Sequence, residues 1–259
     1  MGFLDKLFGK KEEVSPGGST IYRYEDQDGR KLQVPETAGT YLEEIEAHFD
    51  SLFPGRESFV YHEILSDIVH IDVHIMKPTA EQPFYVVFTT GMSDKPMSIP
   101  REIPRKERAD LELAELFVFL PGDWELGGVG KSGSDVSPAH FWPIQMLKFL
   151  ARFPHEYQTW LAYGHTIPNG AEYAPLDHSV GFGGVVLRSG GGPLCSMTAK
   201  DGRKLNFYQM VPAYKEEIEY KLKYGMEGLE KVFQEHRISP VLDPQRPNLC
   251  PDFKEILDG

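Results

Sequence analysis

Short runs of β-branched and aromatic residues, separated by polar turns, dominate the chain. The clearest run is YVVFTT at residues 85–90, which is too apolar for an edge strand and too short for a helix. Gly91 follows this run and permits a turn that other residues resist, and Ser93 and Asp94 can hydrogen-bond such a turn locally. The pattern therefore predicts a buried strand at residues 84–90 that ends in a polar loop.

Similar runs predict the rest of a sheet. Further strands are expected at residues 59–64, 69–76, 113–120, 159–163, 183–188, 194–198 and 204–211. Residues 21–34 are typical of a hairpin that turns at Asp28-Gly29. Residues 95–109 hold three prolines and many charges, which favours a long exposed loop.

Three segments have apolar residues at helical spacing. The first begins near Thr40, a predicted cap, and its apolar face consists of Tyr41, Leu42, Ile45, Phe49 and Leu52. Residues 143–153 predict a central, buried helix with Pro143 in its first turn, and residues 214–235 predict the longest helix, weakened or kinked at Gly225 and Gly228. Because strands and helices do not alternate regularly, we expect an α+β fold, with helices packed against a mixed, mostly antiparallel sheet.

The two ends of the chain differ from its middle. Residues 1–11 place four apolar side chains opposite lysines, which predicts a short basic amphipathic helix and a weak contact with a membrane surface. Residues 12–20 have the composition of a linker, and four prolines after residue 239 predict an extended tail along the surface. We therefore expect an N-terminal segment and linker at residues 1–20 and a single domain at residues 21–259.

The charge and cysteine content limit the classes of partner. A net charge of −12 disfavours nucleic acid, whose phosphates need a basic surface, and fits a cationic protein partner. Cys195 and Cys250 match no disulfide or metal framework, so two reduced thiols in a cytoplasmic protein are expected. The sequence contains no run of about 18 apolar residues, so we predict no membrane-spanning helix.

His70, Asp72 and His74 are the strongest candidates for chemistry. Side chains alternate along a strand, so these three would project from one face as ligands for zinc or iron, which suggests a metal-dependent hydrolase. However, His70 and His74 would lie about 13 Å apart on a straight strand, and a bulge or a distant ligand such as His165 or His178 would be needed. Since no nucleophile has an evident base beside it, we expect no catalysis, cofactor or metal.

Several short motifs, in order, carry a resemblance to a known family. They are HIDVHIMKP at residues 70–78, FYVVFTTGMSDKPM at 84–97, AELFVFLP at 114–121, FWPIQMLKFLARFPHEY at 141–157, YGHTIPNG at 163–170 and LNFYQMVPAYKEEIEY at 205–220. Together they resemble the Suppressor of Fused domain, especially its compact bacterial members. The resemblance implies a mixed α/β binding module without established chemistry. The animal relative sequesters a zinc-finger transcription factor, and many bacterial relatives look like immunity proteins that neutralise a cognate toxin.

Two loops, at residues 163–169 and 175–184, combine aromatic, glycine and polar residues and suit recognition. The candidate partner-binding residues are Asp72, Ser93, Asp94, Trp124, Tyr163, His165, Asn169, Asp177 and His178. Trp142 is expected in the core because it leads a buried helix. The leading hypothesis is a non-enzymatic immunity protein that occludes a cationic toxin. The alternatives are the metal-dependent hydrolase and an adaptor recruited to a membrane surface by residues 1–11. The oligomeric state is not predicted.

Overall fold

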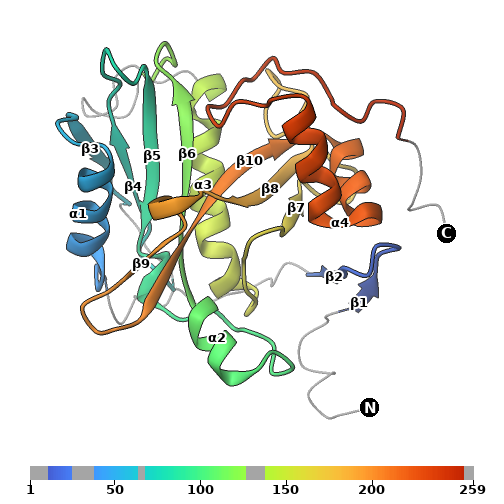
Figure 1. The fold of residues 1–259 in the computed structure, drawn as a ribbon, viewed down its shortest axis with the longest axis horizontal. Helices are drawn as coiled ribbons and strands as arrows, with labels where there is room; N and C mark the ends of the chain where they lie inside the picture. The colour runs from blue at the N-terminus through green and yellow to red at the C-terminus, as the bar shows by residue number, and fades with distance from the viewer. Residues whose placement is uncertain (1–10, 25–37, 64–67, 127–137, 254–259) are drawn as a thin grey trace.

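A single large sheet organises the molecule in the computed structural model, which describes residues 11–24, 38–63, 68–126 and 138–253 (Figure 1). The order across the eight-stranded sheet is β3 (Ser58–Tyr61), β4 (Asp72–Met76), β5 (Phe84–Thr90), β6 (Leu113–Pro121), β10 (Lys204–Ala213), β8 (Gly184–Ser189) and β7 (Thr166–Pro168), and β9 (Ser196–Thr198) also pairs with β10. The β6–β10 pair is parallel, and the other pairings in this sheet are antiparallel. The predicted fold class is therefore confirmed.

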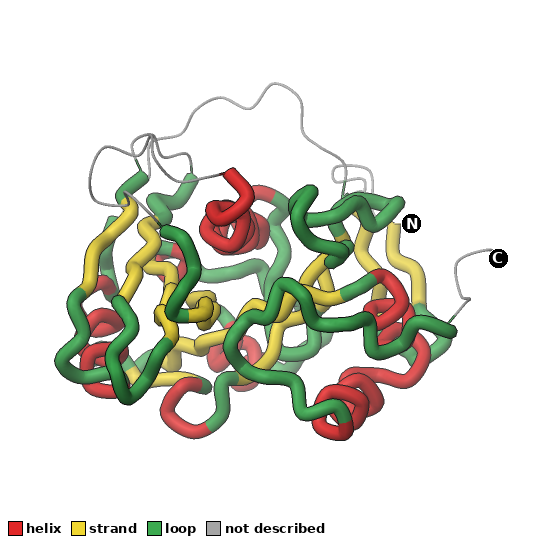
Figure 2. Tube along the Cα trace, turned by 90° about the horizontal axis from the view of Figure 1, so that it is seen from above, coloured by secondary structure: helices red, strands yellow, loops and turns green. Residues whose placement is uncertain are grey.

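Helices cover both faces of this sheet (Figures 1 and 2). Helix α3 (Pro138–Glu156) packs on one face, and its core cluster includes Ile71, Val73 and Ile75. Helices α1 (Leu42–Leu52) and α4 (Lys215–Glu235) cover opposite ends of the other face, in separate apolar clusters. The three aliphatic side chains of the strand around residue 73 are fully buried on the α3 face, as alternation predicts. Asp72 and His74 are buried as well, so the strand is covered on both faces. Trp142 is also buried, as predicted.

The turn after β5 requires a glycine, as the sequence indicates. Gly91 has a φ of 100°, and a Cβ at this position would lie 1.8 Å from the carbonyl oxygen of His70. The carboxylate of Glu115 then accepts hydrogen bonds from the Ser93 N–H (2.9 Å), the Ser93 hydroxyl (2.6 Å) and the Thr89 hydroxyl (2.6 Å). Burial raises the pKa of Glu115 to about 7. The turn is thus locked onto β6 by one buried acid.

The N-terminal region differs from the expected linker. Strand β1 (Lys11–Val14) pairs with β2 (Thr20–Arg23), so a strand lies where composition indicates only connecting chain. The Gly17 N–H donates to the carbonyl of Leu222 at 2.9 Å, which ties this hairpin to α4. Pairing within this hairpin and its contact with α4 thus override the linker-like composition. Of the helix predicted at residues 1–11, only Lys11 is described, and it begins β1. The predicted turn at Asp28-Gly29 lies outside the described residues.

Three helix boundaries also differ. Helix α2 (Arg105–Leu111) occupies part of the predicted loop and begins just after Pro104, a residue that suits helix starts. Helix α3 begins at Pro138, so Pro143 lies inside the helix and not in its first turn. Tyr41, not Thr40, is the cap residue of α1, and it makes no side-chain cap bond. The kink predicted in α4 is confirmed, because Gly225 has non-helical angles (φ 75°, ψ 174°).

The strand predicted at residues 159–163 is wrong. The carbonyl of Thr159 accepts the Ser98 N–H at 2.9 Å, and the Leu161 N–H donates to the Met97 sulfur at 3.3 Å, so this segment pairs with a loop instead of the sheet. The edge strand is β7, inside the predicted recognition loop. Cys195 precedes β9 and is not part of it. No helix among the described residues is long and apolar enough to cross a membrane.

Candidate protein-binding surface

The first group of predicted binding residues lies where β4 begins and β5 ends. Ser93 is only 1% exposed. Asp94 accepts the backbone N–H groups of Gly39 (2.6 Å) and Thr40 (2.8 Å), which lead into α1, and burial raises its pKa. Asp94 therefore holds the chain just before α1, and Ser93 is buried against Glu115 and offers little free surface.

Asp72 belongs to the same end of the sheet. Its two carboxylate oxygens lie 2.9 Å from Nδ1 of His62 and 3.0 Å from Nε2 of His70, and one of them also accepts the Glu63 N–H at 2.9 Å. This network joins the turn between β3 and β4 to the start of β4. The carboxylate is therefore a local structural acceptor.

His74 has contacts of its own beside this network. Its Nε2 lies 2.9 Å from the Thr90 hydroxyl, its ring stacks on Phe88 at 4.8 Å, and Nδ1 is 3.4 Å from a carboxylate oxygen of Glu46. Burial lowers the pKa of His74 to about 4. His70, Asp72 and His74 do not converge on a point, and no three His, Cys, Asp or Glu side chains in the described part of the chain gather to hold a metal ion.

A second group surrounds the edge strand β7. Tyr163 is 47% exposed and His178 is also exposed, whereas the amide of Asn169 donates to two carbonyls of the following loop at 3.0 Å each. Asp177 accepts the hydroxyl and N–H of Ser179 and so organises the loop tip. Burial lowers the pKa of His165 to about 4. Tyr163 and His178 therefore remain the accessible candidates of this group.

Trp124 stands apart from both groups. It is 8% exposed, and its Nε1 donates to the carbonyl of His140 at 2.8 Å. Its ring lies in the core cluster beneath α3, close to Trp142. A partner would reach this side chain only after a local rearrangement.

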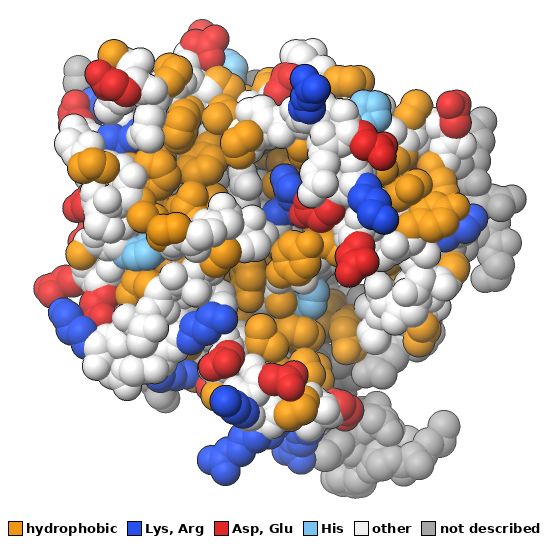
Figure 3. Space-filling model, in the orientation of Figure 1, with side chains coloured by type: hydrophobic (Ala, Val, Ile, Leu, Met, Phe, Trp, Pro, Cys, Tyr) orange, Lys and Arg blue, Asp and Glu red, His pale blue; other side chains and the backbone are white. Residues whose placement is uncertain are grey.

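Helix α1 presents a row of carboxylates that sequence reasoning missed. Glu43, Glu46 and Asp50 have i, i+3, i+7 spacing, which places them on one side, and the helix contains no Lys or Arg. Burial raises the pKa of Glu46, and the charges of Asp50 and Glu43 raise it further. We call these three residues the acidic row. Figure 3 shows acidic side chains along the margin of the molecule where α1 lies.

The opposite side of α1 is anchored firmly. Ile45 and Phe49 are fully buried, and the Phe49 ring stacks on Phe88 with centroids 3.9 Å apart. His48 stacks on Phe207 at 5.1 Å. Beside the helix, a shallow groove of about 320 Å³ runs toward β9; its lining residues are Glu43, Glu44, Ala47, His48, Met197, Thr198 and Lys200. The acidic row is therefore displayed on a rigid element next to a depression.

The signal for the acidic row was present in the sequence. The apolar positions of residues 41–52 define one helix face, and the remaining positions of that helix carry four acids and no Lys or Arg. Helical spacing applied to the polar positions therefore places Glu43, Glu46 and Asp50 on one side of the helix. Recognition residues concentrate in loops, so loop composition alone does not point to this helix face.

Comparisons with known proteins agree with this fold. The family model for the Suppressor of fused protein (SUFU) matches residues 67–247. A Suppressor of Fused homologue from Neisseria gonorrhoeae FA 1090 aligns with a TM-score of 0.57 and 18% identity, covering 81% of this chain and 96% of that chain. The structure of the Sufu–Fu complex gives a TM-score of 0.56 at 14% identity, covering 86% of this chain and 100% of that chain.

Drosophila Suppressor of Fused is also similar, with a TM-score of 0.56 and 14% identity over 94% of this chain. The match covers 53% of the Drosophila chain, so this chain spans about half the length of that protein. Among curated proteins, none matches in sequence. The family model covers well over half of the chain. The resemblance seen in the sequence motifs is confirmed, and the chain belongs to the Suppressor of Fused family.

Proposed function

We propose that this protein is a non-enzymatic binding module that docks a cationic protein on the acidic row of α1. In the finer form of the proposal it is a cytoplasmic bacterial immunity protein, and it neutralises a cognate toxin by covering the toxin's working surface. The observation that carries the proposal is the row of Glu43, Glu46 and Asp50 on a firmly anchored helix that contains no Lys or Arg. The net charge of −12 and membership of a family with a structure described as the Sufu–Fu complex support it.

The physical argument concerns charge repulsion. Like charges at i, i+3 and i, i+4 destabilise a helix, so the row has an energetic cost when the protein is alone. Lysine and arginine side chains of a partner would relieve that cost on binding. Complementary charge also steers the encounter and raises the association rate. A surface that is costly in the free protein and favourable in the complex suits a binding site better than a solubilising surface.

The test uses the gene next to the one that encodes this chain. The product of that gene is coexpressed with the chain, and both growth protection and copurification are measured. We expect the wild-type chain to protect the cells and to copurify, and the variant E43Q/E46Q/D50N to lose much of both.

The matched control is E107Q/E227Q/E235Q, which removes three charges from exposed positions of α2 and α4. This control should behave as the wild type does, because total charge changes equally in the two variants. If both variants lost protection and copurification equally, only the total charge would matter, and the acidic row would not be the binding site. A neighbouring product that forms no complex with the wild-type chain would refute the immunity proposal.

A further inference from the structure

The central parallel pair of strands is paired over only part of its length. The ladder between β6 and β10 ends at the pair Phe117–Gln209, although both strands continue. Beyond that point residues 239–253, which we call the strap, take the place beside β6. Val241 forms a parallel bridge with Phe119, and the Leu242 N–H donates to the Phe119 carbonyl at 2.9 Å. The strap therefore closes the opening that the two strands leave.

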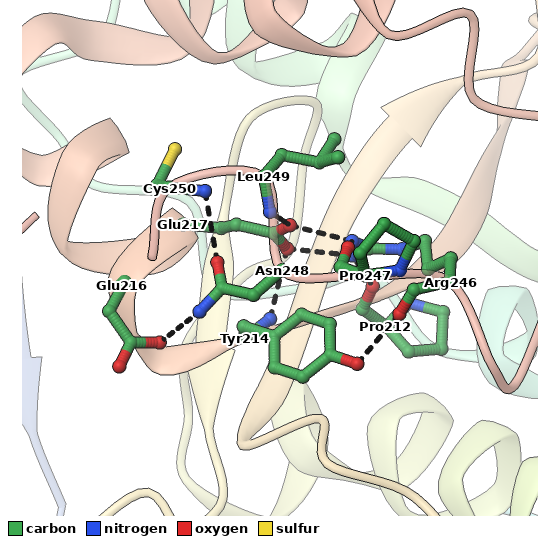
Figure 4. Close-up of polar contacts among 9 residues, drawn as sticks. All are labelled: Pro212, Tyr214, Glu216, Glu217, Arg246, Pro247, Asn248, Leu249 and Cys250. Carbon is green, nitrogen blue, oxygen red and sulfur yellow. Dashed lines mark hydrogen bonds and ion pairs between the residues drawn. The ribbon is translucent and has the colours of Figure 1, made fainter. Parts of the chain in front are cut away.

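One arginine anchors the strap (Figure 4). The two terminal nitrogens of Arg246 each lie 2.6 Å from an oxygen of Glu217, and one of them also donates to the Pro212 carbonyl at 2.7 Å. The guanidinium carbon is 5.0 Å from the ring centroid of Phe182 and 5.3 Å from that of Tyr214. This planar, bidentate arrangement between aromatic rings selects a guanidinium over an ammonium.

The buried carboxylate of Glu217 needs a positively charged partner such as this guanidinium. Its side chain is 0% exposed, and it also accepts the N–H groups of Tyr214 and Leu249 at 3.0 Å each. If Arg246 left without a replacement, a fully buried carboxylate would lose its counter-charge, which is strongly unfavourable. Any segment that displaces the strap must therefore bring an arginine of its own.

The strap does not fill the opening that it crosses. A cavity of about 310 Å³ remains between the strap, β10 and the end of α4, with Val118, Phe182, Met210 and Leu242 in its lining. Interiors normally close-pack, whereas a cavity of this size is typical of ligand sites. The prolines at 240, 244, 247 and 251 also prevent a continuous ladder with β6. The strap is held by discrete polar anchors, among them the Gln209 amide that donates to the Pro240 carbonyl at 2.6 Å and the Tyr214 hydroxyl that donates to the Arg246 carbonyl at 2.7 Å, and it leaves room in the groove that it crosses.

We infer that this groove is a receptor for an extended, arginine-bearing segment of a partner protein, and that the strap is its resident occupant. The incoming segment pairs with β6 near Phe119, places its guanidinium on Glu217, and carries an aliphatic residue four positions earlier, as the strap carries Leu242. Larger side chains than those of the strap enter the remaining cavity. The inference holds whether or not the partner also docks on the acidic row of α1.

Hydrogen exchange on the full wild-type chain tests whether the strap can leave. The amides of Leu242 and Leu249 are expected to exchange through a local opening, at least about a hundredfold faster than the Phe207 amide of β10 under the same conditions. Equal protection of the strap and β10 amides would show that the strap opens only with global unfolding, and it would overturn the inference.

Peptide binding tests the specificity of the groove. A labelled peptide with the sequence of residues 239–253 is titrated into the full wild-type chain and into the L242A variant, in which the covalent strap competes less well. We expect tighter binding to L242A, because the tethered strap acts at millimolar effective concentration in the wild type. A peptide with alanine in place of the arginine should bind about a hundredfold more weakly.

Three outcomes would overturn the proposal: no binding to either chain, equal binding to both chains, and equal binding of the peptide without arginine. If L242A does not fold, the titration is carried out with the wild-type chain at high peptide concentration, where the arginine requirement is measured in the same way. The E43Q/E46Q/D50N chain should bind the peptide as the wild type does. Failure of the α1 proposal and failure of the groove proposal are thereby separated.

Discussion

Neutralising the acidic row should stabilise the free protein. In the triple variant E43Q/E46Q/D50N each replacement keeps the size and approximate helix propensity of the original residue and removes one negative charge. The E46Q replacement also keeps a side-chain oxygen near His74, whose Nδ1 lies 3.4 Å from the Glu46 carboxylate. The change therefore isolates the electrostatic cost of the row from its packing.

The magnitude follows from two like-charge pairs and the two helix ends. The pairs Glu43–Glu46 and Glu46–Asp50 cost about 0.2–0.5 kcal/mol each. Asp50 near the negative end of the helix adds about 0.3–1 kcal/mol, but Glu43 in the first turn offsets a similar amount, because an acid is favourable there. The net cost is about 0.4–1 kcal/mol, and solvent screening of these exposed groups favours the lower end. For a protein of this size, 1 kcal/mol corresponds to about 2–4 °C in Tm.

Differential scanning calorimetry at low and high salt measures this effect. We expect Tm to rise by about 1–4 °C at low ionic strength and the gain to shrink in about 1 M salt, where charges are screened. The control is E57Q, because Glu57 already pairs with Lys77 at 2.7 Å and its loss should not raise Tm. A lower Tm for the triple variant, or a gain that high salt leaves unchanged, would refute the reasoning.

Four further expectations concern stability. G91A should lower the free energy of unfolding by roughly 2–5 kcal/mol, because its Cβ would meet the His70 carbonyl; a urea titration that shows less than about 1 kcal/mol would contradict this. F49A should cost about 3–5 kcal/mol by the same assay, and a near-neutral result would mean that α1 is not anchored by this ring. The pKa of Glu115 is about 7 in the folded state and 4.5 in the unfolded state, so the free energy of unfolding falls as pH rises from about 4.5 to about 7. The E115Q variant should show a weaker dependence of the free energy of unfolding on pH over this range. The pKa of buried His155 is lowered to about 4 from 6.5, so its contribution is complete above pH 6.5 and is lost as pH falls toward 4; an NMR titration that finds His155 protonating near 6.5 would contradict this.

The fold could be predicted where the signal is local. The run that forms β5, the glycine at its end and the kink at Gly225 depend on residues within a few positions, and each agrees with the structure. The irregular order of strands and helices was enough for the α+β class. By contrast, β1 depends on pairing with β2 and on the contact of Gly17 with α4, which composition does not reveal.

The candidate sites show the same division. The acidic row is local, and its helical spacing was readable from residues 43–50. The Arg246–Glu217 pair is not, because 29 residues separate the partners and each looks like an ordinary surface charge in the sequence. Ser93 and Trp124 are candidate partner-binding residues in the sequence, but both are buried in the structure. Polar loop residues near a sheet serve the scaffold as readily as a partner, and only packing distinguishes the two roles.

The association rate with the neighbouring gene product tests the central claim most directly. Stopped-flow mixing at low and physiological salt compares the wild-type chain, E43Q/E46Q/D50N and E107Q/E227Q/E235Q. Steering by the acidic row predicts an association rate constant about tenfold lower for the first variant at low salt, a smaller difference at higher salt, and a near wild-type value for the second. Equal rate constants for the two variants at every salt concentration would contradict the account.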